Sequence, residues 1–439
     1  MAFDREAAVS WYKRNRGRSR MLFDMLPDGV YYSRPIALRH PIVFYEGHLP
    51  GFSFNTLVKK ALGGASIDAR LETLFARGID PHESSADSSG AIAAGWPDRD
   101  VVRQFAAEAD ARVLDALARE DLDRPGDLLL DRGEAVFSIL EHEAMHQETL
   151  LYMWHRLPLA DKHRPAGYAP TVEGVTPAGE WIDVPAGRAV LGVDRDAVPF
   201  GWDNEFPSCT VGVAAFSIER HNVTNARFAE FVDAGGYRDG RWWSPEDWRW
   251  VQSERVEHPL FWERSDGGWL WRGMFELIPL PLSWPVYVSH AEAAAYTRWR
   301  GLRLPTEAEY QRAAFGVDGA QSLSSHPWGD APPDDARGVF DFSSWDPQPA
   351  GSHPRGASAW GVEDLAGNGW EWTSTPFAPF PGFSAMASYP EYSADFFDGE
   401  HYVMKGASPA TARELLRPTF RNWFRARYPY VYATFRCAR

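Results

Sequence analysis

A joint rich in proline and glycine separates two parts of the chain that differ in their residue patterns. The joint, RPAGYAPTVEGVTPAGE at residues 164–180, concentrates the two residue types that most often interrupt helices and strands. With 439 residues, 44% of them hydrophobic, the chain is long enough to bury two or three cores. The sequence therefore predicts two domains, residues 1–165 and residues 166–439.

The part before the joint has the pattern of a helix bundle. Residues 98–119 and 133–157 repeat apolar side chains at spacings of three and four, which is the period of an amphipathic helix. Residues 80–97, DPHESSADSSGAIAAGWP, are small and polar, as loops are. We therefore expect a helical N-terminal domain.

The part after the joint has shorter elements. Apolar runs at residues 181–185 and 209–216 predict strands, and only brief stretches such as 225–234 and 291–300 have helical spacing. Many turn residues and tryptophans lie between them. This pattern predicts an α+β domain with long ordered loops.

The helix predicted at residues 134–157 carries two histidines on one face. It contains strong helix formers and no internal glycine or proline, and Pro158 follows it. Within HEAMHQE, His142 and His146 stand one turn apart, so both imidazoles can reach one ion. His155 falls about 180° away from His146 around the helix and is not expected to be a ligand.

The letters H-E-x-x-H also occur in zinc peptidases, where the glutamate is the general base. The extended peptidase pattern requires glycine and histidine where this chain has Thr149 and Tyr152. We therefore disfavour a peptidase and interpret Glu143 as a helix residue that supports the ligands or faces solvent. Two histidines that bind no metal are the simpler alternative.

A third ligand is available upstream, in RHPIVFYEGHLPGFSFN at residues 39–55. His48 follows Gly47 in an aromatic-rich stretch, and His40 is a competing candidate. Three neutral imidazoles leave up to three positions open on an octahedral ion. That arrangement suits a non-haem iron(II) centre, although zinc and copper also accept imidazole.

Charge and cysteine content exclude several classes of partner. The net charge of -15 opposes binding to nucleic acid or to an anionic membrane surface. Cys209 and Cys437 are too few for a disulfide framework, which indicates a reducing compartment. No stretch approaches the ~18 apolar residues of a membrane helix, and the first residues lack the apolar core of a signal peptide. The sequence thus predicts a cytoplasmic protein with small-molecule partners and gives no indication of its oligomeric state.

Several motifs together resemble one family. The G-H pair at 47–48 and H-E-x-x-H-Q-E at 142–148 are similar to the DinB-like four-helix bundle of the ergothioneine-type sulfoxide synthases. GWDNE at 201–205, RLPTEAEY at 303–310, DLAGNGWEW at 364–372 and FRNWF at 420–424 resemble their formylglycine-generating-enzyme-like, C-type-lectin-related domain. The resemblance covers nearly the whole chain, and it implies this two-domain architecture.

The resemblance implies an enzyme that uses iron(II) and dioxygen. Members of the family join a chalcogen to the imidazole C2 of hercynine, the trimethylated betaine of histidine, or of histidine itself. By position, His48, His142 and His146 would hold the iron, and Gln147 would lie beside the iron-bound imidazole of the substrate.

The resemblance also implies substrate contacts in the second domain. Asn422 would hydrogen-bond the amino-acid part of hercynine, and Trp423 would face its quaternary ammonium through a cation–π contact. Tyr389 and Tyr392 match the family's paired tyrosines, one proposed to supply a proton or electron and the other part of the hydration network.

The chain departs from the family at the residues that bind the chalcogen donor. Members that use γ-glutamylcysteine have two arginines in the segment that corresponds to residues 80–97, and an aspartate after the Asn–Trp pair. Here that segment has no arginine, and Phe424 follows Trp423. An uncharged pocket rejects a dianionic peptide, because a buried carboxylate without a partner costs several kcal/mol.

This departure favours a neutral, hydroxyl-rich donor such as a selenosugar, which is the substrate of the selenoneine synthase branch that the stretch around His48 resembles. The alternative is a sulfoxide synthase of ergothioneine or ovothiol type that uses γ-glutamylcysteine or cysteine. In that case a displaced arginine, Arg77, Arg99 or Arg103, would bind the carboxylates. The non-enzymatic alternative is a lectin-like binding protein with a structural metal.

Overall fold

The computed structural model describes residues 4–76, 95–316 and 324–439. By the contacts between residues, the chain divides into two compact units. They are Met1–Gly167 with Ala387–Tyr389, and Tyr168–Met386 with Pro390–Arg439. Most of the loop predicted at residues 80–97 lies outside the described residues.

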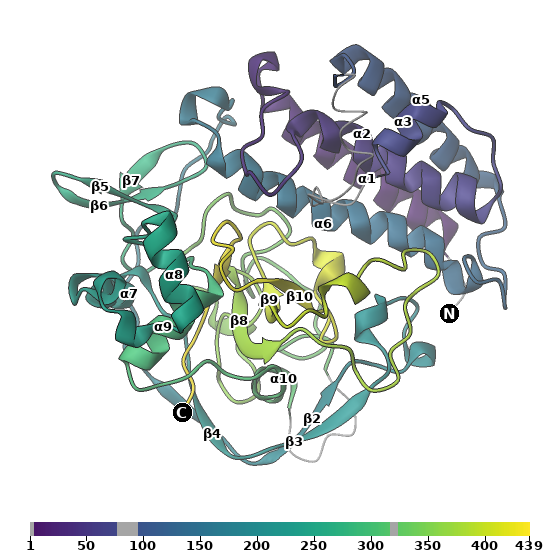
Figure 1. The fold of residues 1–439 in the computed structure, drawn as a ribbon. Coiled ribbons are helices and arrows are strands. Elements are labelled where there is room, and N and C mark those ends of the chain that lie inside the picture. The colour runs from purple at the N-terminus through teal and green to yellow at the C-terminus, as the bar shows by residue number, and fades with distance from the viewer. Residues whose placement is uncertain (1–3, 77–94, 317–323) are drawn as a thin grey trace. The chain divides into compact units, whose positions relative to one another are not determined.

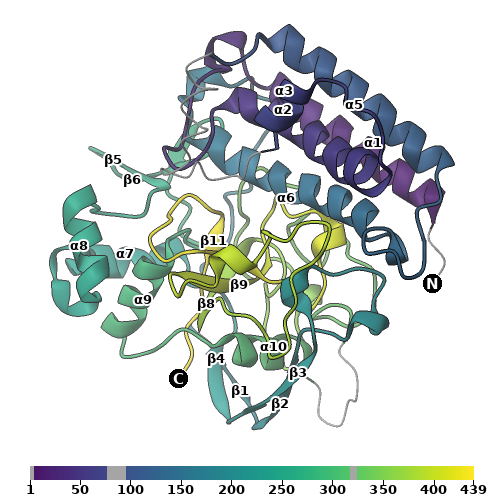
Figure 2. The same cartoon turned by 45° about the vertical axis from the view of Figure 1, so that its right-hand side comes forward.

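The first unit is a helix bundle, as the sequence predicts. Its α-helices and one π-helix are α1 (Arg5–Asp24), α2 (Ile42–Ser53), η2 (Phe54–Ala61), α3 (Ala69–Leu74), α5 (Arg99–Arg119) and α6 (Glu134–Arg156). Within this unit α1, α2, α5 and α6 lie side by side (Figures 1 and 2). The two helices expected from apolar spacing are α5 and α6, and each begins one residue later than expected.

The core of the bundle lies where α1, η2, α5 and α6 meet. Its fully buried side chains include Tyr12, Leu57, Val113, Leu117 and Ile139. Burying a side chain of this size contributes roughly 1.5–3 kcal/mol to stability. The apolar core therefore holds η2, which continues directly from α2, against α6, the helix that carries His142 and His146.

Glycine allows α2 to approach the end of α3. A Cβ atom at Gly47 would lie 2.4 Å from the ring carbon Cζ of Phe75, a distance too short for any side chain. Pro50 within α2 removes one backbone donor, and after Ser53 the chain continues as the π-helix η2. The close approach brings His48, the next residue, into the interior of the bundle, where it is 2% exposed.

The second unit is α+β, also as predicted. Its helices are α7 (Asn225–Asp233), α8 (Pro245–Glu254), α9 (His290–Trp299) and α10 (Glu307–Phe315). Its strands are β1 (Trp181–Val184), β2 (Gly187–Leu191), β3 (Cys209–Val213), β4 (Phe216–Glu219), β5 (Trp262–Ser265), β6 (Gly268–Arg272), β7 (Leu277–Pro279), β8 (Gly369–Pro376), β9 (His401–Ala407), β10 (Asn422–Arg425) and β11 (Ala433–Thr434). The apolar run at 209–216, expected as one strand, forms β3 and the start of β4.

The largest sheet of the described residues has the order β10-β9-β8-β11. Strands β10, β9 and β8 are antiparallel, and β11 runs parallel to β8. In the smaller sheets β1 pairs with β4, β2 pairs with β3, and β6 lies between β5 and β7. Because β10 carries Asn422, Trp423 and Phe424, this sheet sets the positions of three predicted site residues.

A buried arginine near the C-terminus binds to β8 and to neighbouring loops of the second unit. Arg436 donates two hydrogen bonds to the Glu371 carboxylate on β8, at 2.6 and 2.7 Å, and neither side chain is more than 1% exposed. The guanidinium also donates to the backbone carbonyls of Glu219, Arg220 and Glu363. Since a buried charge is costly without partners, this network fixes the path of the chain that follows β10.

The structure also bears on membrane-spanning helices and on disulfide bonds. No helix among the described residues is both long and apolar enough to cross a bilayer. Cys209 and Cys437 are free thiols, so no disulfide joins them.

Candidate metal centre

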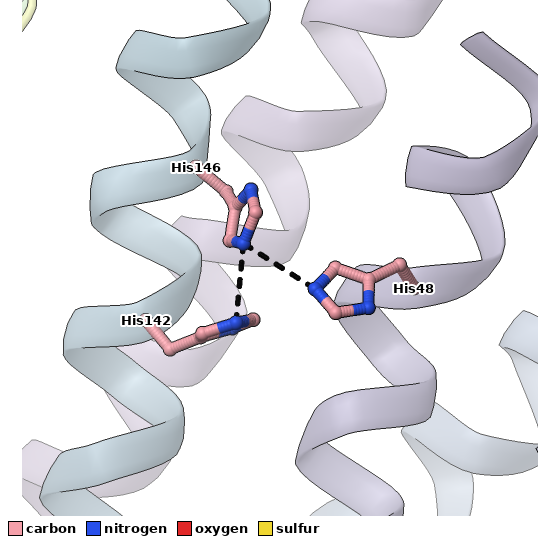
Figure 3. A group of neighbouring side chains, drawn as sticks. All are labelled: His48, His142 and His146. Carbon is pink, nitrogen blue, oxygen red and sulfur yellow. Dashed lines mark hydrogen bonds between the residues drawn. The ribbon is translucent and has the colours of Figure 1, made fainter. Parts of the chain in front are cut away.

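The structure brings the three predicted histidines together. His142 and His146 project from the same face of α6, and His48 projects from α2 (Figure 3). The Nε2 atom of His146 lies 3.1 Å from Nε2 of His142 and 3.3 Å from Nε2 of His48. Each side chain is 2% exposed. The three nitrogens therefore converge on one point in the interior of the bundle.

These imidazoles are neutral at physiological pH. Burial lowers the pKa of His48 to about 4, despite a hydrogen bond to a backbone carbonyl that opposes the shift. Burial also lowers the pKa values of His142 and His146 well below the ordinary histidine value, and neighbouring positive charge adds to both shifts. Neutral imidazole is the form that binds metals, because its unprotonated nitrogen offers a lone pair.

The donor set fits a transition-metal ion with open positions. No Cys, Asp or Glu of the described residues joins the three histidines in the group. A structural zinc site is closed by four protein ligands, whereas catalytic centres keep positions for substrate. Three imidazoles suit iron, zinc or copper.

The three ligands differ in how their ring planes are held. The Nδ1–H of His48 donates to the Phe75 carbonyl at 2.7 Å, which leaves the lone pair on Nε2. The Nδ1 atoms of His142 and His146 are buried and have no hydrogen-bond partner among the described residues. Instead, the Phe52 ring stacks on His142, with 3.6 Å between centroids and 13° between planes.

Sequence reasoning did not identify Phe52. A usable signal was present, because Phe52 follows His48 by four residues and therefore shares its face of α2. The contact with His142 depends on how α2 and α6 pack, which no local pattern encodes.

Glu143 faces α1 and not solvent. Its carboxylate is fully buried, accepts a hydrogen bond from Ser19 Oγ at 2.6 Å, and forms an ion pair with Arg16 at 2.8 Å. Burial raises the pKa of Glu143, and Arg16 and Ser19 oppose that rise. Of the two alternatives for Glu143, the solvent-facing one is therefore wrong, and a role in supporting the ligands stays a prediction. The engagement of Glu143 with α1 further disfavours the role of peptidase base.

The Gln147 side chain also points to α1. Its Nε2 donates to the Asn15 carbonyl at 2.9 Å and to Ser19 Oγ at 3.0 Å. A residue that follows His146 by one position lies about 100° further around the helix. The structure thus does not bring the Gln147 amide beside the imidazoles, and its role in substrate binding stays a prediction.

His40 and His155 lie outside the group. His40 is buried, and its ring packs on Phe44 with 4.2 Å between centroids. His155 is buried near the end of α6. Among the described residues the nitrogen group contains only His48, His142 and His146, so His48 rather than His40 is the third member.

Tyr389 belongs to the first unit although it is distant in sequence. Its ring centroid lies 6.1 Å from that of His142 and 5.2 Å from that of Phe52. Hydrogen bonds from η2 and α6 hold the two residues that precede Tyr389. Lys60 Nζ donates to the Ala387 carbonyl at 2.8 Å, and the Ser388 and Ser138 hydroxyls lie 3.0 Å apart.

Tyr392 and Trp423 come together in the second unit. The Tyr392 ring stacks on Trp202 with 3.9 Å between centroids, and lies edge-on to Trp423 at 5.2 Å. Trp423 also stacks on Phe377 at 4.2 Å, with 5° between planes. The two predicted tyrosines therefore lie in different packing environments, Tyr389 beside a histidine and Tyr392 among aromatic rings.

The other predicted residues of β10 are half-buried. Asn422 is the first residue of the strand, and its Oδ1 accepts from the backbone N–H of Trp423 at 2.9 Å. Phe424 stacks on Tyr428 with 5.2 Å between centroids. Asn422, Trp423 and Phe424 remain predicted substrate contacts.

The arginines that were alternative clamps for a carboxylate donor are already paired. Arg99 donates to Glu46 at 3.2 Å and to Asp28 at 2.6 Å. Arg103 approaches the same Glu46 carboxylate at 3.4 Å. Arg77 and most of the segment at 80–97 lie outside the described residues.

The bundle with its three-histidine centre, joined to an α+β unit, defines a class of two-domain metal-binding protein.

The DinB superfamily matches residues 12–150, and the sulfatase-modifying factor enzyme 1-like domain matches residues 169–439. The chain is 39% identical to the hercynine oxygenase of Mycolicibacterium smegmatis, over 73% of each chain. It is 37% identical to the hercynine oxygenase of Mycobacterium tuberculosis, again over 73% of each. With the ergothioneine biosynthesis protein 1 of Neurospora crassa it shares 28% identity over 94% of this chain and 55% of that protein. The chain belongs to the ergothioneine-type sulfoxide synthase family.

Proposed function

We propose that this protein is an iron(II)- and dioxygen-dependent enzyme that forms a carbon–chalcogen bond at the imidazole C2 of hercynine. The observation that carries the proposal is the convergence of three buried, neutral imidazoles without a fourth protein ligand among the described residues. Relatives that cover most of the chain are named hercynine oxygenases, which supports hercynine as the substrate.

The reaction requires an oxidant and a controlled proton. Joining C2 to a selenol or thiol breaks one C–H and one Se–H or S–H bond and releases two protons and two electrons, which would reduce dioxygen to hydrogen peroxide. If the chalcogen is also oxidised to the selenoxide or sulfoxide, one oxygen atom goes to the chalcogen and the other leaves as water. Iron(II) held by His48, His142 and His146 would supply the open positions at which dioxygen and substrate are activated. The protein must bind and orient hercynine, exclude water and deliver a proton.

Tyr389 is the residue that we assign to proton delivery. Its ring packs near His142, and the two residues before it are held by the bond from Lys60 to the Ala387 carbonyl and by the Ser388–Ser138 contact. A phenol positioned within reach of the reacting group can act as a general acid. Tyr392, which packs on Trp202, is assigned to the substrate's surroundings.

Residues of β10 and its neighbours are proposed to hold hercynine. Trp423 is half-buried and offers an indole face to a trimethylammonium group, a contact worth roughly 0.5–2 kcal/mol. Asn422 offers an amide to the amino-acid part of the substrate. Gln147 would have to release its hydrogen bonds to Asn15 and Ser19 on α1 before its amide could contact hercynine.

For the donor we propose a selenosugar, as in selenoneine synthases. Phe424 stands where the relatives that use γ-glutamylcysteine have an aspartate, and its ring packs on Tyr428. Arg99 and Arg103 are paired with Glu46 and would have to leave it to bind another carboxylate. Both observations support a neutral donor over γ-glutamylcysteine or cysteine.

A donor panel tests this proposal. The iron(II)-loaded protein is incubated with hercynine and dioxygen and, separately, with a selenosugar, a thiosugar, γ-glutamylcysteine and cysteine, and products are identified by mass spectrometry. We expect the selenosugar to couple fastest. Efficient coupling of γ-glutamylcysteine without any sugar coupling would overturn the assignment of the donor, while leaving the hercynine chemistry in place.

The pair Phe424→Asp and Phe424→Leu locates the donor pocket. Phe424→Asp should reduce kcat/KM for the sugar donor by roughly tenfold or more, which is ~1.4 kcal/mol of binding, with little change in hercynine binding. Phe424→Leu keeps the pocket uncharged and should behave more like the parent. Equal losses for hercynine and donor in Phe424→Asp would remove this residue from the donor site.

The non-enzymatic alternative makes an opposite prediction. A lectin-like protein with a structural metal binds its ligand without altering the metal's surroundings. Addition of hercynine to the anaerobic iron–nitrosyl form should change its electron paramagnetic resonance spectrum if hercynine binds at the centre. An unchanged spectrum at saturating hercynine would favour the binding protein.

A further inference from the structure

Two of the three histidines, His142 and His146, lack, among the described residues, the hydrogen bond that metal ligands usually make through their second ring nitrogen. A histidine that binds a metal through one ring nitrogen normally donates a hydrogen bond from the N–H of the other nitrogen to a carbonyl, carboxylate or water. This bond fixes the plane of the ring. His48 has this bond to the Phe75 carbonyl at 2.7 Å. The Nδ1 of His142 has no such partner among the described residues, although it is buried. Some other contact must set the plane of the His142 imidazole.

That contact is the Phe52 ring. Its centroid lies 3.6 Å from that of His142, and the two planes differ by 13°. At this distance the imidazole cannot rotate about its Cβ–Cγ bond without striking the phenyl ring. An aromatic pair of this kind is worth roughly 0.5–1.5 kcal/mol beyond the apolar area that it buries.

Phe52 reaches His142 because it shares a helix face with another ligand. Phe52 and His48 are four residues apart on α2, and their ring centroids are 6.2 Å apart. The same Phe52 ring lies 5.2 Å from Tyr389. One face of α2 thus presents both a ligand and the ring that packs against a second ligand.

We propose that Phe52 is a positioning residue that fixes the imidazole plane of His142 and so directs Nε2 at the metal, in place of the missing hydrogen bond at Nδ1. This inference rests on the proposed metal centre. Without the phenyl ring, His142 would sample several ring orientations, and metal binding would have to order it.

Phe44 provides a matched comparison within the same helix. Its ring also stacks on a ligand, His48, with 4.8 Å between centroids and 20° between planes. However, His48 keeps its orienting hydrogen bond to the Phe75 carbonyl whatever stands at position 44. Loss of the Phe44 ring should therefore affect metal binding less than loss of the Phe52 ring.

The test is an anaerobic titration with Fe(II) alone, on the parent, Phe52→Leu, Phe52→Tyr and Phe44→Leu, after thermal unfolding has established that each is folded. Phe52→Leu should bind Fe(II) about 10- to 100-fold more weakly, the range seen when the groups that orient a ligand are lost. Phe52→Tyr keeps the stacked ring and should bind like the parent, and Phe44→Leu should lie close to it. At saturating iron, the nitrosyl spectrum of Phe52→Leu should be broadened by mixed orientations of His142.

Two results would overturn the inference. One is parent-like affinity and an unchanged nitrosyl spectrum in Phe52→Leu. The other is an equal loss in Phe52→Tyr, which would indicate a packing effect rather than stacking. If Phe44→Leu does not fold, the Leu and Tyr variants at position 52 still decide between these outcomes. Failure of the parent to bind Fe(II) would instead refute the proposed function.

Discussion

Arg16 on α1 and Glu143 on α6 form a buried ion pair, with 2.8 Å between Nη1 and Oε1. Arg16 also binds Asp110 on α5, with 2.8 Å between Nε and Oδ1. The glutamate of the H-E-x-x-H pattern therefore ties the histidine-bearing helix to two other helices of the bundle. In a peptidase the same glutamate would face the metal-bound water.

The Glu143→Gln variant tests whether Glu143 stabilises the fold or takes part in the reaction. The amide keeps an acceptor for Ser19 and Arg16 but removes the charge, so the free energy of unfolding should fall by roughly 1.5–3 kcal/mol. Iron binding and turnover of the folded variant should persist. Urea unfolding measures the first effect, and Fe(II) titration with a turnover assay measures the second. Lost turnover in a variant that still folds and binds iron would give Glu143 a role in the chemistry.

Tyr389→Phe should reduce turnover without reducing iron affinity. The substitution removes the phenol hydroxyl and keeps the ring that packs near His142 and Phe52. Loss of a general acid typically costs about 10²- to 10⁴-fold in rate.

Tyr392→Phe is the matched control for Tyr389→Phe. It keeps the stack on Trp202, and we expect a smaller fall in turnover. The turnover rate constants of the two variants are compared at saturating hercynine and donor. If turnover fell in Tyr392→Phe and not in Tyr389→Phe, proton delivery would have to be assigned to Tyr392 instead of Tyr389.

Asp203 should make the stability of the second unit depend on pH. Burial raises the pKa of Asp203 from 3.8 to about 6, although a hydrogen bond from Ser393 opposes the shift. Between these values the folded protein binds the proton more tightly than the unfolded chain does. The free energy of unfolding therefore falls as pH rises through this window, by at most about 3 kcal/mol at ~1.4 kcal/mol per pH unit.

The Asp203→Asn substitution replaces the carboxyl group that titrates with a neutral amide, which still offers an acceptor to the Ser393 hydroxyl. Its stability relative to the parent should increase as pH rises from about 4 to 7, because the parent alone then carries a buried negative charge. Urea unfolding across this range gives the difference directly. A difference between variant and parent that does not vary with pH would show that Asp203 titrates in the folded protein as it does in the unfolded chain.

The histidines of α6 were predictable from local periodicity, and His48 was not. The spacing of His142 and His146 is one helical turn, so any helix at 134–156 places them on one face. His48 comes from a different helix, α2, whose burial in the bundle depends on the close approach of Gly47 to Phe75 at the end of α3. The motifs that resemble a family supplied the choice of His48 over His40.

Neighbours in sequence proved to be poor guides to neighbours in the site. Gln147 follows His146 directly, yet helix geometry turns it to Asn15 and Ser19. Phe52, a residue that no motif marked, packs on His142 because two helices meet there. The α+β unit was predictable in class from its short apolar runs, but its strand pairing depends on long-range contacts such as Arg436 with Glu371.

The central claim is that the iron(II) form of this protein breaks the C2–H bond of hercynine and joins that carbon to a chalcogen. The most direct measurement uses hercynine deuterated at C2, with the selenosugar and the thiol donors in separate reactions, and follows the masses of hercynine and product. We predict a coupled product that lacks the deuterium, formed only with Fe(II) and dioxygen and absent in His142→Ala. Hercynine recovered with its deuterium intact for every donor, or equal coupling by His142→Ala, would contradict the account.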